Sequence, residues 1–168
     1  MFASRARVAD YPHHLSTFDY IGTYRYFLTF CTCNRQPAFL DADAVAIVHA
    51  QILRACSDKS FLIHAYCYMP DHLHMLVEGT AADSTLKGMI ARAKQYSGFY
   101  YKQAFGKQLW QRYGYERTLR HDEETLVIAR YIVANPIRAS LANSLGEYPH
   151  WGSSTWTREQ LIDYVRAG

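Results

Sequence analysis

Ala65-Tyr-Cys-Tyr-Met-Pro-Asp-His-Leu-His-Met-Leu-Val-Glu-Gly79 is a largely apolar, partly alternating run that contains the four residues Met69-Pro-Asp-His72. Proline at the second of four such positions is typical of a tight turn. The residues on both sides of the turn have the composition of strands. The run from Phe61 to Gly79 is therefore predicted to form a β-hairpin.

Two histidines, His72 and His74, stand at the start of the second strand of this hairpin. Residues i and i+2 of a strand point to the same face, so both imidazoles should project side by side. Leu73, Met75 and Val77 should then face a core. Two neighbouring imidazoles can hold a divalent cation if a third ligand comes from elsewhere. A His-x-His pair is short and common, however, and two histidines on a half-exposed strand explain it equally well.

The rest of the chain completes a β-α-β-β-α-β order. Residues 24–33 are rich in aromatic and β-branched side chains and predict a strand, and residues 109–120 predict a loop followed by a strand. The predicted helices run from Asp41 or Asp43 to about Cys56, from Asp83 or Ser84 to Gly106, and from Asp122 to near Asn135-Pro136. This order predicts an α+β, ferredoxin-like sandwich in which helices cover one face of an antiparallel sheet of four to five strands.

The length of 168 residues indicates a single domain, with a flexible arm at 1–20 and a C-terminal tail at 142–168. No run approaches the roughly 20 apolar residues that span a bilayer, and no apolar signal core follows the N-terminus. The four cysteines form no Cys-x-x-Cys pair, which suits an intracellular chain with reduced thiols.

Positive charge and aromatic rings gather in one segment, residues 84–138. The segment holds ten basic and four acidic residues, a net charge of +6, together with nine aromatic residues. Cations interleaved with rings suit a single-stranded nucleic acid, with phosphates on the cations and bases stacked on the rings. The alternative is a solvated basic face above ordinary core aromatics.

The third predicted helix supplies groups that the histidine pair lacks. Tyr131 and Asn135 are four residues apart and so project from one helix face. The amide oxygen of Asn135 is a candidate third ligand for a hard divalent ion. The phenol of Tyr131 is a candidate nucleophile if a metal and basic side chains activate it. Taken singly, each residue also has an ordinary explanation, as a packed aromatic and as a helix-end residue before proline.

In combination these residues resemble the HUH (His-hydrophobic-His) superfamily of single-strand nucleases. Within it they resemble the transposases associated with repetitive extragenic palindromes (REP), a branch of the single-tyrosine transposases. The resemblance spans roughly Tyr24 to Trp151 and is carried by Tyr68-Met-Pro-Asp-His-Leu-His74, Lys87-Gly88, Trp110-Gln111 and Tyr131-Ile-Val-Ala-Asn-Pro-Ile-Arg-Ala-Ser-Leu141. Asn135 stands where insertion-sequence members usually carry glutamine.

The resemblance implies a metal-dependent endonuclease and transposase that cleaves and rejoins single-stranded DNA near REP-like hairpins through a covalent 5′-phosphotyrosine. Tyr131 would be the nucleophile, with Mg²⁺ or Mn²⁺ on His72, His74 and Asn135. The protein would bind single-stranded or hairpin DNA in the cytoplasm, associated with the nucleoid, as a monomer in preference to a homodimer.

The candidate DNA-binding residues come from the basic segment. They are Lys87, Lys94, Trp110, Gln111, Arg112, Arg117, Arg120 and Arg138. Three other functions remain open from the residues alone: a non-catalytic single-stranded nucleic-acid-binding module on the same fold, a metal-dependent hydrolase that uses water as the nucleophile, and a small structural zinc protein.

Overall fold

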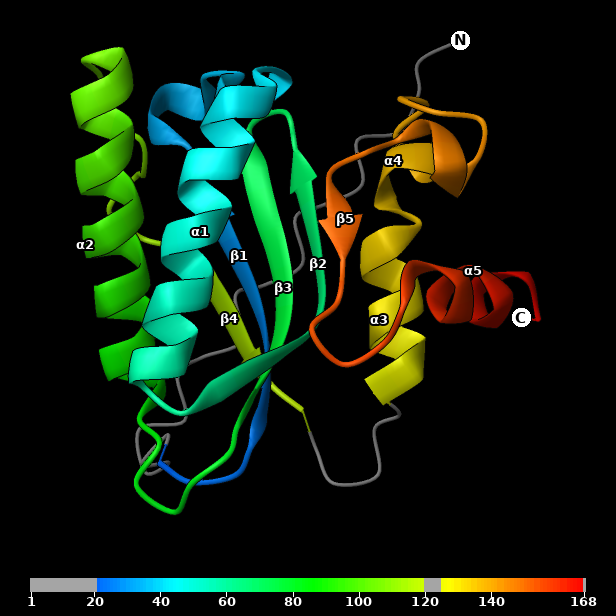
Figure 1. Ribbon diagram of the computed structural model, residues 1–168, viewed down its shortest axis with the longest axis horizontal. Coiled ribbons are helices and arrows are strands. Elements are labelled where there is room, and N and C mark those ends of the chain that lie inside the picture. Colours follow the sequence, from blue (N-terminus) through cyan, green and yellow to red (C-terminus); the bar gives the residue numbers. More distant parts are fainter. Residues whose placement is uncertain (1–20, 120–124, 168) are drawn as a thin grey trace, which may run out of the picture.

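A computed structural model describes residues 21–119 and 125–167. At its centre lies a five-stranded antiparallel sheet with the strand order β4-β1-β3-β2-β5 (Figure 1). The strands are β1 (Arg25–Cys31), β2 (Phe61–Met69), β3 (His72–Gly79), β4 (Tyr115–Thr118) and β5 (Trp151–Gly152). The predicted α+β sandwich with four to five strands is confirmed. The predicted arm at 1–20, Arg120 and the helix cap Asp122 lie outside the described residues.

The helices cover both faces of this sheet, so the prediction that they cover one face is wrong. They are α1 (Ala42–Asp58), α2 (Leu86–Phe105), α3 (Thr125–Val133), α4 (Asn135–Arg138) and α5 (Arg158–Arg166). Helices α1 and α2 stand on one side of the sheet, and α3 and α5 on the other (Figure 1). The physical reason is that β3 is apolar on both faces. Leu73 and Met75 pack toward α1 and α2, whereas Leu76 packs toward α3.

Side-chain caps fix where the first two long helices begin. The carboxylate of Asp41 accepts hydrogen bonds from the backbone N–H groups of Asp43 and Ala44, as predicted for α1. Thr85, and neither Asp83 nor Ser84, caps α2, because its hydroxyl accepts from the backbone N–H of Gly88. Gly106 ends α2 in the left-handed region, at φ 69°, which a glycine adopts at little cost.

The predicted hairpin is confirmed, and its register places the histidines. Met69 pairs with His72 across the turn. On the other side of β3, Thr29 lies opposite His74 and Cys31 opposite His72. Side chains that are directly opposite in an antiparallel pair share a face. Thr29, Cys31 and both histidines therefore face the α3 side of the sheet.

Trp110 belongs to the core between α2 and the sheet. Its side chain is 6% exposed, and its Nε1 donates a hydrogen bond to Ser97 Oγ at 2.8 Å. The indole also lies edge-on to Phe30, with ring centroids 5.5 Å apart. A buried indole is not placed to stack on a base, so any part of Trp110 in DNA binding, which stays a prediction, would not be base stacking. No described helix is long and apolar enough to cross a membrane.

Truncating this ring should destabilise the fold. Trp110→Ala is expected to lower the free energy of unfolding by about 3–5 kcal/mol, because it opens a cavity and leaves Ser97 without its donor. Urea unfolding followed by circular dichroism measures the change. The control is Tyr113→Ala, whose side chain is 73% exposed and should change stability by less than about 0.5 kcal/mol. Equal effects of the two substitutions would contradict this assignment of Trp110.

Candidate active site

His72 and His74 converge on one point above the sheet. Their Nε2 atoms are 3.1 Å apart. The other ring nitrogen of each histidine is hydrogen-bonded. His72 Nδ1 lies 2.7 Å from Asp71 Oδ1, and His74 Nδ1 lies 2.8 Å from Thr29 Oγ1. Two ring nitrogens this close need a shared proton or a shared cation between them. Metal-binding histidines are characteristically held through the second ring nitrogen in this way, so the pair fits a divalent ion.

Both imidazoles are held in the neutral form. Burial, together with the nearby charges of His72, Arg138 and Arg35, lowers the pKa of His74 to about 3. Burial also lowers the pKa of His72, against an opposing effect of its hydrogen bond to Asp71. A histidine must be unprotonated to ligate a metal. The site therefore presents two ligand nitrogens at neutral pH.

Arg35 is a neighbour of the pair that the sequence did not single out. Its Nε lies 2.9 Å from Asp71 Oδ2, and its Nη1 donates to Cys31 Sγ at 2.8 Å. The chain reaches this position through Asn34 and Arg35 themselves, both in the left-handed region at φ 52° and 54°. Arg35 lies outside the basic segment 84–138, so charge patterning gave no signal for it.

Tyr131 lies on the same side of the sheet as the histidines. Its side chain is 49% exposed on α3, and its ring is edge-on to Phe27 of β1 at 6.1 Å between centroids. The same Phe27 ring lies 5.4 Å from His74. One phenyl ring thus contacts both the phenol ring of Tyr131 and one member of the histidine pair, His74. Tyr115 of β4 also contacts Phe27, with ring centroids 6.2 Å apart, and so places another phenol on this face.

Asn135 lies where α3 gives way to α4. The interruption at Ala134 is explained by Pro136, which has no N–H to continue the helix. Arg138 follows Tyr131 by about two helical turns, and its guanidinium lies 3.8 Å from the centre of the Tyr131 ring in spite of the interruption. One helix face therefore continues across the interruption. Asn135, half-buried and one turn after Tyr131, lies on that face.

Among the described residues, no group of three or more His, Cys, Asp or Glu side chains is placed to hold a metal. Structural zinc sites use four Cys or His ligands. The described part of the chain therefore gives the zinc alternative no support. An ion on the histidine pair would need further oxygen ligands, such as an amide, water or phosphate.

The structure divides the candidate DNA-binding residues into two groups. Arg117 pairs with Phe27 in the β1–β4 register and so, like Arg138, belongs to the active-site face. Lys94, Gln111 and Arg112 gather at α2 on the opposite face. Lys94 Nζ donates to the carbonyl of Gln111 at 3.3 Å, and burial lowers its pKa.

The remaining candidates fall into neither group. Lys87 is exposed near the N-terminal end of α2, and Arg120 lies outside the described residues.

Comparison with known proteins gives the family. Residues 21–135 match the sequence model of the family described as "Transposase IS200 like". The chain belongs to the IS200-like transposase family. The chain is also similar to a Haemophilus influenzae protein assigned as a REP-associated tyrosine transposase. The two are 25% identical over 136 residues, which cover 74% of this chain and 77% of the relative.

Solved structures show that the IS200-like transposase fold is shared. A REP-associated tyrosine transposase bound to a REP hairpin matches with a TM-score of 0.67 at 22% identity, covering 79% of this chain and 78% of that one. A crystal structure of a candidate transposase from Deinococcus radiodurans matches with a TM-score of 0.50 at 20% identity, covering 69% and 92%. The fold resemblance stated from the sequence is thereby confirmed.

Proposed function

We propose that this protein is a metal-dependent endonuclease and transposase that cuts and rejoins single-stranded DNA beside hairpins, through a covalent bond to Tyr131. The observation that supports this most directly is the Phe27 ring, which contacts both Tyr131 and His74. Membership of the IS200-like family supports the class of reaction. The relative and the solved neighbour named for REP support a REP-like hairpin as the substrate. A DNA substrate would bring the protein to the nucleoid.

The histidine pair would hold Mg²⁺ or Mn²⁺ through the two Nε2 atoms, with the amide oxygen of Asn135 as the proposed third ligand. When bound, such an ion polarises a non-bridging phosphate oxygen and offsets the negative charge that develops on it. Thr29 and Asp71 orient the two rings through Nδ1. Because the pKa values of His72 and His74 are lowered, both imidazoles stay unprotonated at neutral pH and can act as ligands.

The phenol of Tyr131 carries the covalent step. Its oxygen attacks the phosphorus, a tyrosine–phosphate bond forms, and the bond from phosphorus to the 3′-oxygen breaks. The phenolic proton is lost and the 3′-oxygen gains one, which leaves a 5′-phosphotyrosine and a free 3′-hydroxyl. The product is still a phosphodiester. A 3′-hydroxyl of the same or another strand can therefore reverse the step and rejoin DNA without an external energy source.

Arg138 is expected to position this phenol. A guanidinium stacked on a tyrosine ring stabilises the pair by about 0.5–1 kcal/mol at an exposed site, and its charge also faces the phosphate. Arg138→Ala should slow single-turnover cleavage by about 10–100-fold, and Arg138→Lys, which keeps the charge without the planar stack, should lie in between. The matched control is Arg166→Ala, an exposed arginine on α5. A wild-type rate in Arg138→Ala would remove this role.

The ring contacts that link the phenol to the histidines lie within one chain. Phe27 contacts both His74 and Tyr131 of its own chain. This arrangement supports a monomer that acts on DNA in cis. The oligomeric state stays a prediction until it is measured.

A further inference from the structure

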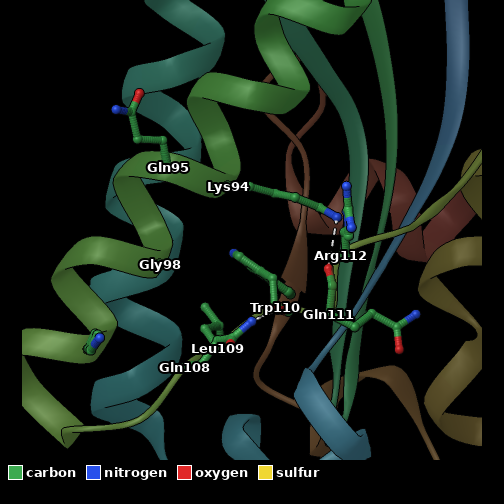
Figure 2. A pocket seen from close by; sticks show the side chains of 9 residues that line it. Lys94, Gln95, Gly98, Gln108, Leu109, Trp110, Gln111 and Arg112 are labelled. Carbon is green, nitrogen blue, oxygen red and sulfur yellow. Dashed lines mark hydrogen bonds between the residues drawn. The ribbon is translucent and has the colours of Figure 1, made fainter.

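A cavity of about 430 Å³ opens between α2 and residues 108–112 (Figure 2). It lies on the side of the sheet that α1 and α2 cover, opposite to the face that carries the histidines. We propose that this cavity binds an unpaired nucleotide of the single-stranded DNA that flanks the cleavage site. This inference rests on the proposed function, because it identifies a further part of the same substrate. The volume lies within the range of pockets that bind small ligands, about 300–1,000 Å³.

The charge of the lining suits a nucleotide phosphate. Lys94, Lys102 and Arg112 line the cavity, and no carboxylate is among its lining residues. Lys94 reaches across from α2 toward the segment that carries Gln111 and Arg112 (Figure 2). The cations thus come from both walls. A phosphate between these walls would be contacted from two sides, which favours a bound polyanion over a merely basic surface.

One glutamine, Gln108, offers the cavity a fixed hydrogen-bond acceptor. Gln108 Nε2 donates to the carbonyl of Trp110 at 3.0 Å, whereas the Gln111 side chain points away from α2 (Figure 2) and donates to the carbonyl of Tyr113. The Gln108 bond fixes the amide plane and with it the direction of the side-chain oxygen. Every base carries N–H groups on its pairing edge from which such an oxygen can accept a hydrogen bond. Only an unpaired base exposes that edge.

The wall of the cavity is open because Gly98 has no side chain. A Cβ at Gly98 would lie 3.8 Å from Cδ1 of Trp110, an ordinary contact distance, so nothing in the helix requires glycine here. Phe99, on the next position of α2, is 56% exposed, and Tyr113 beyond Arg112 is 73% exposed. Two exposed rings close to a basic cavity are suited to stacking bases on either side of the bound nucleotide.

The cavity is close to the cleavage site across the sheet. The backbone N–H of Gln111 donates to the carbonyl of Cys31, and Cys31 pairs with His72. Two strand spacings, about 10 Å, therefore separate Gln111 from His72 along the sheet. A single strand that leaves the histidine pair over the end of β1 reaches the cavity within a few nucleotides.

The test measures binding by full-length protein that carries Tyr131→Phe, so that cleavage plays no part. The probes are a DNA hairpin with randomised single-stranded flanks and the same hairpin without flanks. Lys102→Ala with Arg112→Ala removes two cations. Gly98→Leu fills the cavity without changing charge and replaces glycine by a better helix former. The control is the double variant Lys59→Ala with Arg166→Ala. It also removes two positive charges, but at positions that do not line the cavity: the C-terminal cap of α1 and helix α5.

The expected result is selective for the flanks. The double cation variant and Gly98→Leu should each weaken binding of the flanked hairpin by about tenfold or more and leave the unflanked hairpin unchanged. Gly98→Ala should fall between wild type and Gly98→Leu. The double cation variant should also reduce the slope of log K against log salt by about 1.4 for the flanked probe, at about 0.7 for each single-strand phosphate contact.

Two outcomes would overturn the inference. Equal weakening on both probes would show that the cavity contacts the hairpin stem, and unchanged binding on both would show that it holds no DNA. Because binding is measured without cleavage, either outcome leaves the roles of Tyr131 and the histidines to their own tests.

Discussion

Tyr131→Phe is expected to abolish strand cleavage and the covalent protein–DNA adduct while it changes hairpin binding by less than about twofold. The substitution removes only the oxygen that attacks phosphorus and keeps the ring that packs against Phe27 and under Arg138. Loss of a nucleophile costs other covalent enzymes about 10⁴-fold or more in rate. The measurement is single-turnover cleavage of an end-labelled hairpin with single-stranded flanks, with a denaturing gel to detect the adduct.

Tyr115→Phe is the matched control for this substitution. Tyr115 also contacts Phe27 and lies on the same face of the sheet, so it is the other phenol with a comparable position. Tyr115→Phe should retain cleavage. If Tyr115→Phe lost the adduct and Tyr131→Phe kept it, the nucleophile would be Tyr115 and not Tyr131. Cleavage by Tyr131→Phe without any adduct would favour the water-dependent hydrolase, and binding without cleavage by wild type would favour the binding module.

His74→Ala is expected to reduce metal-dependent cleavage and Mn²⁺ affinity by more than about 100-fold. Removing one imidazole leaves a single ring nitrogen at the proposed site, and His74 is the more buried ligand. Thr29→Val removes only the partner of His74 Nδ1, so a smaller loss of about 10–100-fold is expected from it. Mn²⁺ binding can be followed by calorimetry and by electron paramagnetic resonance, independently of cleavage.

His150→Ala provides the control for loss of an imidazole outside this site and should bind Mn²⁺ as wild type does. Mixing the Tyr131→Phe and His74→Ala proteins then tests whether one chain completes the site. No recovery of cleavage is expected, because the phenol and the histidines act in cis. Recovered activity would show that two chains share their helices. Wild-type Mn²⁺ affinity in His74→Ala would contradict the proposed metal site itself.

The hairpin and its histidine pair were predictable because they depend on local rules. Alternation along a strand and a proline turn at Pro70 place His72 and His74 on one face, whatever surrounds them. The approach of Tyr131 to that pair depends on a helix more than fifty residues later. The spacing predicted only that Tyr131 and Asn135 share a helix face. That this face lies beside the histidines was predicted from the family resemblance alone.

Other features depend on packing that a single sequence does not encode locally. The apolar residues Leu76 and Val77 are adjacent in β3 and point to opposite faces, which indicates that both faces of the sheet are buried. The prediction that helices cover one face did not take this pair into account. Trp110 lies in a basic, aromatic segment, and only the structure shows its indole inside the core. Arg35 reaches the site through a left-handed turn that has no distinctive sequence pattern.

The most direct test of the central claim is peptide mapping of the covalent product by mass spectrometry. After reaction with a flanked hairpin, nuclease trimming and trypsin digestion, the phosphonucleotide is expected on the peptide Tyr131–Arg138, at the tyrosine. Its presence on the peptide Tyr113–Arg117, or cut DNA with free ends and no modified peptide, would contradict the claim that Tyr131 attacks DNA beside the histidine pair.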